Sequence, residues 1–236
     1  MTEANEGRAQ AEPRPWPSSS RIDQVVVGLI LIDFQHDFCS PGGLADRLGY
    51  AISELEPVRA SARRVLVAAR AAGWSVVHTR VGRPEHLIDP GSEGSEDPIV
   101  GSWGPLGRHL VQGSPGYEIV DDLAPAPGEV VVDKLGKGAF HGTELDSTLR
   151  AGGVTHLVFA GVTSDVCVLS TFREAHDRGY DSLVLTDATG SYWPESHQAA
   201  MHLVTTQGGL LGSRTSVALL LDMMPPAGRA GTGTRR

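Results

Sequence analysis

Continuous apolar runs recur along the chain and predict the strands of a sheet. Residues 25–32 form one such run without a charged side chain, which is typical of a strand buried on both faces of a parallel sheet. Shorter runs of the same kind predict strands over 74–79, 129–132, 156–160 and 182–186, and residues 208–211 predict a short edge strand.

Segments of helical composition separate these runs. They cover residues 54–72, 142–151, 165–178, 195–207 and 215–223, and the first three are each followed by a glycine, as helix ends commonly are. Strands that alternate with helices predict βαβ units and a parallel sheet, and right-handed crossovers place helices on both of its faces. The predicted fold is therefore a three-layer α/β/α sandwich.

The two ends of the chain and one internal segment lack this periodicity. Residues 1–21 and 225–236 are rich in small and polar residues and in proline, so we expect two disordered tails around a single domain over 22–224. Residues 81–116 are rich in glycine, proline and charge. Loops of this length are usually functional, which predicts a lid or an oligomer contact there.

Composition narrows the class of protein. Hydrophobic residues make up 40% of the chain and charged residues 20%, as in ordinary globular domains. The net charge of −8 argues against nucleic-acid binding and against attraction to anionic membranes, and no apolar run approaches the roughly 20 residues of a membrane span. Only two cysteines and no signal-peptide pattern predict a cytoplasmic protein.

Three reactive side chains follow predicted strands. Asp33 comes directly after the run 25–32, Lys134 comes shortly after residues 129–132, and Cys167 comes after strand 156–160 and a short turn. In open parallel sheets, ligands bind beyond the carboxyl ends of the strands, so these side chains are expected at one edge. A carboxylate, an ammonium and a thiol there form a candidate catalytic group.

The chemistry of each side chain indicates a role. Cys167 would attack a carbonyl as a thiolate, which its place in the first turn of a helix favours. Lys134 would lower the pKa of the thiol, and Asp33 would take its proton and return it to a departing amine. Taken singly, these residues also fit a buried cysteine, a helix-capping aspartate and a solvated lysine. The catalytic interpretation therefore depends on all three together.

Three segments resemble the isochorismatase-like cysteine hydrolases: LILIDFQHDFCSPGG, VVDKLGKGAF and GVTSDVCV with the downstream REAHDRGY. The resemblance runs from residue 25 to residue 221 and implies a six-stranded parallel sheet and a homo-oligomer, either a dimer or a tetramer. Asp33, Lys134 and Cys167 match the catalytic residues of that family. It also implies a cis peptide bond at Val162–Thr163, with the amides of Thr163 and Cys167 holding an oxyanion.

Within that family, the segments SPGYEIVDDL, DKLGKGAF and TTQGGLLG are most similar to the biuret and triuret amidohydrolases. This similarity implies a small-molecule amide substrate, biuret, which is cleaved to allophanate and ammonia through a thioester. Gln207 matches a glutamine that holds the urea-like substrate, and Phe38 and Phe140 are expected as aromatic walls. Lys137 is either a solvated loop lysine or the cation that a carboxylated substrate would need.

Two alternatives stay open on the same residues. One is hydrolysis of ureidoacrylate or of an N-carbamoyl amino acid, and the other is a non-catalytic binding protein on this fold. Metal-dependent relatives carry an Asp-x-His segment with further histidines, a spacing that His78, His86 and His109 do not show. We therefore expect no catalytic metal and no cofactor. Cys39, which has no basic neighbour in sequence, is interpreted as structural.

Overall fold

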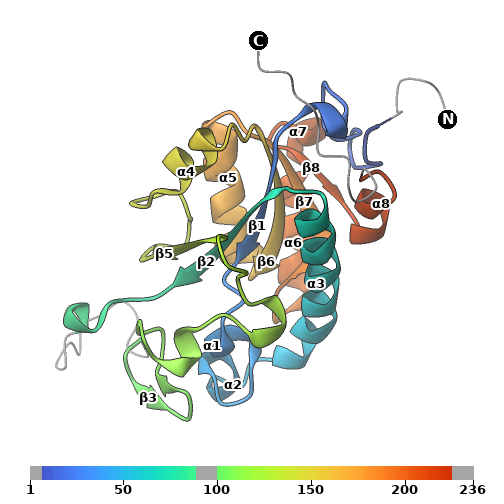
Figure 1. Ribbon diagram of the computed structural model, residues 1–236. Helices are drawn as coiled ribbons and strands as arrows, with labels where there is room; N and C mark the ends of the chain where they lie inside the picture. The colour runs from blue at the N-terminus through green and yellow to red at the C-terminus, as the bar shows by residue number, and fades with distance from the viewer. Residues whose placement is uncertain (1–6, 89–99, 225–236) are drawn as a thin grey trace.

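A six-stranded sheet forms the centre of the computed structural model, which describes residues 7–88 and 100–224 (Figure 1). All five strand pairings are parallel, which confirms the predicted sheet. In spatial order the strands are β5 (Val130–Lys134), β2 (Ser75–Val81), β1 (Val27–Ile32), β6 (His156–Val162), β7 (Asp181–Gly190) and β8 (Ser213–Thr215).

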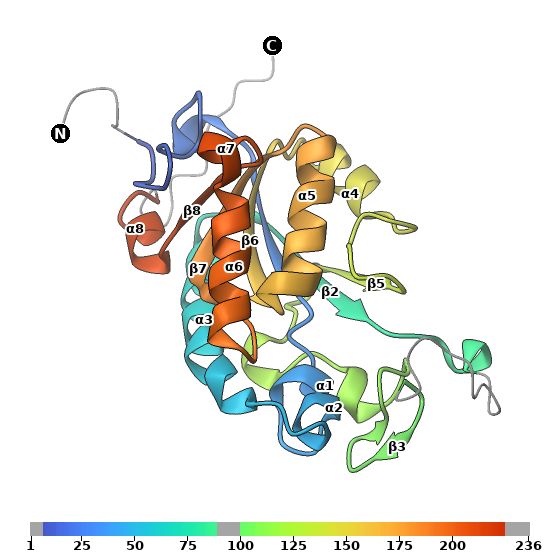
Figure 2. The same cartoon turned by 180° about the vertical axis from the view of Figure 1, so that it is seen from behind.

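Helices cover both faces of the sheet. One face carries α3 (Glu56–Ala71) and α8 (Val217–Leu221), and the other carries α4 (Leu145–Ala151), α5 (Leu169–Asp177) and α6 (Pro194–Val204) (Figures 1 and 2). The predicted three-layer α/β/α sandwich is thereby confirmed.

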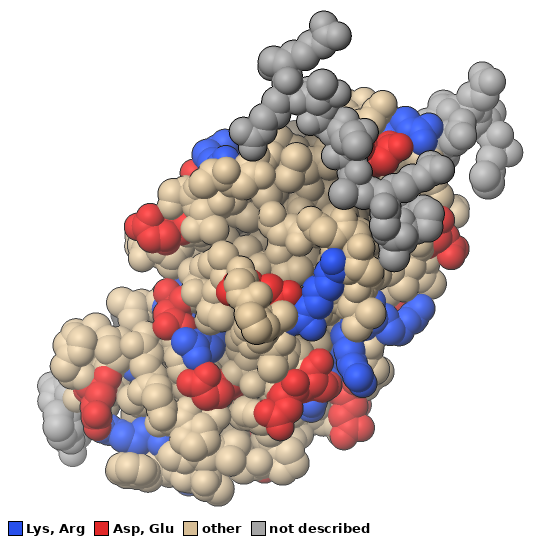
Figure 3. Space-filling model, in the orientation of Figure 1, with Lys and Arg blue, Asp and Glu red and all other residues tan. Residues whose placement is uncertain are grey.

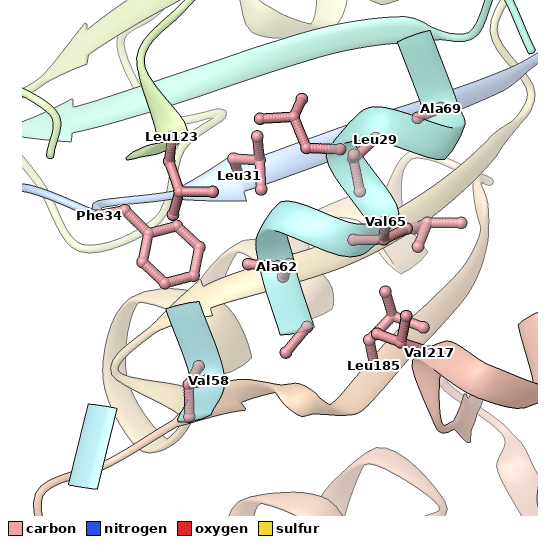
Figure 4. Packing of buried hydrophobic residues seen from close by; sticks show 14 of the residues in the cluster. Leu29, Leu31, Phe34, Val58, Ala62, Val65, Ala69, Leu123, Leu185 and Val217 are labelled. Carbon is pink, nitrogen blue, oxygen red and sulfur yellow. The ribbon is translucent and has the colours of Figure 1, made fainter. Parts of the chain in front are cut away.

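Alternation along β1 explains how one strand serves two cores. Leu29 and Leu31 pack with α3 in one hydrophobic cluster (Figure 4), whereas Ile30 and Ile32 belong to the cluster under α4, α5 and α6. Burying such a side chain contributes about 1.5–3 kcal/mol to the free energy of unfolding. The first strand is thus fixed from both sides, and so is the residue that follows it.

Short elements fill the connections. They are η2 (Ile22–Gln24), α1 (His36–Cys39), α2 (Leu44–Arg47), η3 (Ile52–Leu55), η4 (Glu85–Leu87), β3 (Trp103–Gly104), β4 (Gly107–Arg108), η5 (Pro115–Tyr117), η6 (Asp121–Leu123), the π-helical turn η7 (Ser164–Val168) and α7 (Thr206–Gly209). The segment predicted as a loop over 81–116 contains η4, the β3–β4 hairpin and part of η5, and residues 89–99 of it lie outside the described residues. Its predicted role as a lid or an oligomer contact stays a prediction.

The prediction of an edge strand over 208–211 is wrong. That stretch belongs to α7 and the turn after it, and the edge strand β8 begins at Ser213. Gly208 and Gly209 have φ angles of 70° and 83°, in the left-handed region, where a strand cannot continue. The helix predicted to reach residue 207 accordingly ends at Val204.

Residues 7–21 differ from the disordered tail predicted for 1–21. Trp16 is fully buried, and its ring meets His156 edge to face with centroids 5.8 Å apart. Glu12 and Arg214 exchange two backbone hydrogen bonds of 2.9 Å, so the segment pairs with β8. The open edge of β8 and the large apolar surface of Trp16 supply partners that composition does not reveal. Residues 1–6 and 225–236 lie outside the described residues.

The surface agrees with the acidic, mixed charge of the sequence. On the face shown in Figure 3, acidic and basic side chains are interspersed and form no basic stripe. Among the described residues, no helix has the length and apolar character that crossing a membrane requires.

Candidate active site

The three predicted catalytic residues meet at the carboxyl ends of three strands in the middle and at one edge of the sheet. Asp33 follows β1, Lys134 ends β5 and Cys167 lies in η7, directly after β6. The Lys134 ammonium Nζ lies 2.8 Å from Asp33 Oδ2, and the Asp33 carboxylate lies close enough to the Cys167 thiol to raise its pKa. All three side chains are buried, with exposed fractions of 0%, 2% and 6% for Asp33, Lys134 and Cys167. The arrangement expected from the strand-end rule is therefore present.

The Asp33 carboxylate is held by a neighbour on each oxygen. Thr79 on β2 donates its hydroxyl to Asp33 Oδ1 at 2.6 Å, while Oδ2 faces Lys134. The backbone of Asp33 has a φ of 54°, a left-handed conformation that turns the chain sharply out of β1. Asp33 is thus fixed between β1 and β2 and directed at the thiol.

Lys134 is buried, so the alternative interpretation of this residue as a solvated lysine is wrong. Its Nζ donates to the carbonyl oxygens of Gly136 at 3.1 Å and Lys137 at 2.9 Å, in addition to its ion pair with Asp33. A buried ammonium needs such partners, because desolvation without them is costly. The loop after β5 therefore holds this cation at a fixed point.

The electrostatics of Cys167 differ from the sequence-based expectation. Burial raises the pKa of the Cys167 thiol well above its ordinary value, and the negative charge of Asp33 raises it further. The charges of Lys134 and Lys137 lower that pKa by less. The predicted lowering by Lys134 is therefore present in direction, but burial and Asp33 outweigh it. A raised pKa favours the thiol form, so in the candidate mechanism Asp33 takes the proton as the sulfur attacks.

The turn before Cys167 has the predicted backbone. The Val162–Thr163 peptide bond is cis. The carbonyl oxygen of Thr163 accepts from the amides of Val166 and Val168 at 3.2 and 3.1 Å, which closes η7. Binding of an oxyanion by the Thr163 and Cys167 amides stays a prediction.

Of the predicted substrate residues, Lys137 lies nearest to the chemistry. Its side chain is exposed, and its charge acts on the Cys167 thiol. Phe38 is half-buried against the core cluster of α3, and its carbonyl oxygen accepts from the Tyr192 hydroxyl at 3.0 Å. Phe38 therefore lines the loop of Asp33, but its ring serves packing at least in part.

The Phe140 ring packs against residues that follow α5. Its ring stacks on Tyr180 with centroids 5.9 Å apart, and the Arg178 guanidinium lies 4.8 Å from the ring centroid. The side chain is buried in the core cluster of α5. That cluster also contains Cys167, and the role of Phe140 as a wall of the substrate site stays a prediction.

Gln207 lies at the other end of the sheet from the catalytic group. It belongs to α7, between the end of α6 and the beginning of β8, at the amino ends of the strands (Figures 1 and 2). Its side chain is exposed, and its own φ is 50°. Within one copy of the chain, the predicted contact of Gln207 with a substrate beside Cys167 is therefore wrong.

Two buried side chains that the sequence analysis did not identify, Gln35 and Asp37, support the Asp33 loop. Gln35 donates to the carbonyl oxygens of Val81 and Tyr117 and accepts from the Val81 amide. Asp37 accepts from His109 Nδ1 at 3.0 Å and from two backbone amides. Both lie in the segment DFQHD that carries Asp33, and this proximity in sequence is the signal that could have identified them. Their partners lie up to 82 residues away, which no local pattern shows.

The three histidines considered for a metal lie apart. His78 meets Glu129 at 2.9 Å, His109 meets Asp37, and His86 is exposed in η4. Within 7–88 and 100–224, His, Cys, Asp and Glu side chains form no group of three suited to a metal ion.

Comparisons with known proteins agree with this geometry. RutB of Methylobacterium radiotolerans, a ureidoacrylate amidohydrolase, is 38% identical over 223 residues, which cover 90% of this chain and 86% of that protein. RutB of Stutzerimonas stutzeri, also a ureidoacrylate amidohydrolase, is 35% identical over 224 residues, or 89% and 88% of the two chains.

Solved structures give the same result. An isochorismatase family protein from Desulfovibrio vulgaris aligns with a TM-score of 0.68 at 30% identity, and the match covers 84% of this chain and 97% of that one. The model of the isochorismatase domain matches residues 27–216, which contain the whole sheet and all three buried reactive residues. The chain therefore belongs to the isochorismatase family.

Proposed function

We propose that the protein is a cysteine amidohydrolase that cleaves a C–N bond in the ureido group of a small carboxylic acid, of which ureidoacrylate is the leading candidate. The observation that carries the chemistry is the buried contact of a thiol with a carboxylate that is itself paired with an ammonium. The substrate class is supported by the two RutB relatives, each matched over about nine-tenths of this chain.

The first half of the reaction follows from the protonation states. As the Cys167 sulfur attacks the carbonyl carbon, its proton passes to the nearby Asp33 carboxylate. This transfer moves negative charge from Asp33 to the sulfur, and the Lys134 ammonium stabilises that charge at both positions. The amides of Thr163 and Cys167 hold the oxyanion of the tetrahedral intermediate.

The second half releases the products. Asp33 returns its proton to the nitrogen that leaves, so the C–N bond breaks and a thioester remains on Cys167. Asp33, again a carboxylate, then takes a proton from water, whose oxygen attacks the thioester carbon. The C–S bond breaks, and the thiol regains its proton.

Lys137 supplies the preference for an acid. Its ammonium is exposed but close enough to act electrostatically on Cys167, so a substrate carboxylate can pair with it while the ureido carbon lies at the sulfur. A carboxylate that enters a partly buried site without a cation would lose its hydration uncompensated.

Biuret is the second candidate. The support for it is the similarity of DKLGKGAF and the neighbouring segments to biuret amidohydrolases, and the same thiol chemistry would give allophanate and ammonia. The position of Gln207 at the far end of the sheet removes one argument for it. Because biuret is neutral, it makes no use of Lys137.

An ammonia-release assay over ureidoacrylate, N-carbamoyl amino acids, biuret and triuret tests the proposal. We expect the largest kcat/KM with a ureido acid, and we expect Lys137→Ala to raise KM for that acid roughly tenfold, as loss of one charged contact does. Biuret turnover should change far less, because biuret has no carboxylate to pair with Lys137 and loses only the effect of its charge on the thiol.

Two further variants make the assay specific. Lys137→Arg should keep most of the affinity for the acid, and Arg64→Ala, which removes an exposed cation from α3 on the other face of the sheet, should change nothing. Turnover of biuret but of no ureido acid would overturn the proposed substrate class.

A further inference from the structure

The segment REAHDRGY contributes strongly to the family resemblance, yet it contains none of the three catalytic residues. It lies mainly in α5, the helix that continues from the turn of Cys167. Two side chains at the start of α5 reach across to residues 136–140, the loop that follows Lys134.

Thr171 joins the nucleophile to this loop directly. Its side chain is fully buried, and its hydroxyl donates to the carbonyl oxygen of Cys167 at 2.8 Å. The same oxygen accepts from the backbone amide of Ala139 at 3.1 Å. One hydroxyl therefore bridges the residue that carries the sulfur and the loop that surrounds the ammonium.

Glu174 makes the next contact along the same loop. Its Oε2 accepts from the backbone amide of Phe140 at 3.0 Å. A Cβ on Gly138 would come within 2.5 Å of that oxygen, so only a residue without a side chain permits this approach. Side chains one helical turn apart thus hold two consecutive amides of the loop.

The loop held in this way also provides the two carbonyl groups that bind Lys134. Its Nζ donates to Gly136 and Lys137, and Asp33 completes its surroundings. The contacts form a closed circuit, from Cys167 through Thr171 and the loop to Lys134, and back to the thiol through Asp33. Any movement of the loop would change the distance of the ammonium from the sulfur.

We propose that Thr171 and Glu174 are positioning residues that hold the Lys134 ammonium at its working distance from Cys167 and Asp33. The inference rests on the proposed function, because it treats those three residues as the catalytic group. A merely structural role would lower the free energy of unfolding and leave the chemistry of the thiol unchanged.

Alkylation of Cys167 by iodoacetamide over a range of pH, followed on its own peptide by mass spectrometry, reads this position without any substrate. The charged and titratable groups facing the thiol are Asp33, Lys134, Lys137 and Tyr192. Of these, Lys134 lowers the pKa of the thiol, so a displaced ammonium should move the alkylation profile to higher pH.

Thr171→Val removes both hydrogen bonds at nearly constant volume. We expect the alkylation profile to move to higher pH, and kcat for the ureido acid to fall on the order of 10- to 100-fold with little change in KM. Thr171→Ser keeps the hydroxyl and should restore both values most of the way. A wild-type profile and kcat in folded Thr171→Val would overturn the proposal for Thr171.

Glu174→Ala changes a second, partly exposed residue of the same contact. It tests the positioning role if Thr171→Val does not fold. We expect a smaller shift in the same direction, with rescue by Glu174→Gln, which retains an acceptor oxygen. Asp177→Asn removes an exposed carboxylate from the same helix and is the matched control. A lowered melting temperature with no shift in alkylation would mean a structural role only.

The two readouts separate this inference from the proposed function. A shifted alkylation profile in a protein that hydrolyses no ureido acid would leave the positioning role standing and refute the substrate. Turnover of a ureido acid, with unshifted alkylation profiles in both folded variants, would support the proposed function and refute the positioning role.

Discussion

The two cysteines of the chain lie in short elements at the same end of the sheet, and they differ in the groups around the sulfur that the proposed mechanism requires. Cys39 ends α1 and Cys167 lies in η7, with exposed fractions of 5% and 6%. Burial is the largest cause that raises the pKa of each thiol, to about 12 for Cys39 and further for Cys167. Both thiols are buried and neither has a lowered pKa, so these two properties do not distinguish Cys167 from Cys39.

What differs is the partner of each sulfur. For Cys167, Asp33 has the largest charge effect on the thiol, and Lys134 is paired with that carboxylate. For Cys39, Asp33 is only the last and smallest charge effect, after those of Arg59 and Asp122. In the proposed mechanism, Cys167 is therefore distinguished by an acceptor for the thiol proton and by a cation that stabilises the transfer.

The largest effect should come from Cys167→Ser, which removes the sulfur that distinguishes the site of Cys167 from that of Cys39. A serine hydroxyl is a far weaker acid than a thiol, so Asp33 cannot take its proton readily, and kcat should fall on the order of 10³-fold or more. The melting temperature should stay close to that of the wild type, since the volume changes little. Full turnover in the folded serine variant would refute covalent catalysis by Cys167.

The catalytic side of the contrast could be predicted from the sequence, because it follows a general rule. The apolar runs before Asp33, Lys134 and Cys167 predict parallel strands, and the carboxyl ends of such strands meet at one edge. The sequence could not show that burial and Asp33 outweigh Lys134 in setting the thiol pKa. That balance depends on side-chain exposure and on distances within the folded site.

Features that depend on distant partners could not be predicted in the same way. The segment 7–21 looks unstructured by composition, yet Trp16 is buried against His156. Gln207 was assigned to the substrate from motif similarity alone, and the glycines after it turn the chain at the far end of the sheet. In these cases long-range packing overrides local composition.

Asp37→Asn should have the next largest effect, and it acts on the turn of Cys39. Asp37 is fully buried and accepts from His109 and from the amides of Leu110 and Leu44. Removing one partner of such a buried network should lower the free energy of unfolding by about 3 kcal/mol, measured by urea unfolding. The alkylation profile of Cys167 should stay unchanged in the folded fraction.

Asp33→Asn is the matched control for that prediction. It makes the same chemical change four residues earlier, and we expect it to abolish turnover. Equal stability losses in the two variants, or loss of turnover in folded Asp37→Asn, would contradict the division between a catalytic and a structural aspartate.

The smallest effect should come from Cys39→Ala, which sharpens the comparison from the other side. Removing one buried sulfur leaves a small cavity, so urea unfolding should show a loss of about 1 kcal/mol, with kcat unchanged.

Cys39→Ser keeps the volume but places a hydroxyl where the sulfur is buried. It should therefore cost more than alanine, because an unpaired buried hydroxyl carries a desolvation penalty of about 1–3 kcal/mol. A loss of turnover in folded Cys39→Ala, at unchanged alkylation of Cys167, would show that the turn of Cys39 takes part in catalysis. Unchanged turnover would leave Cys167 as the one sulfur on which the reaction depends.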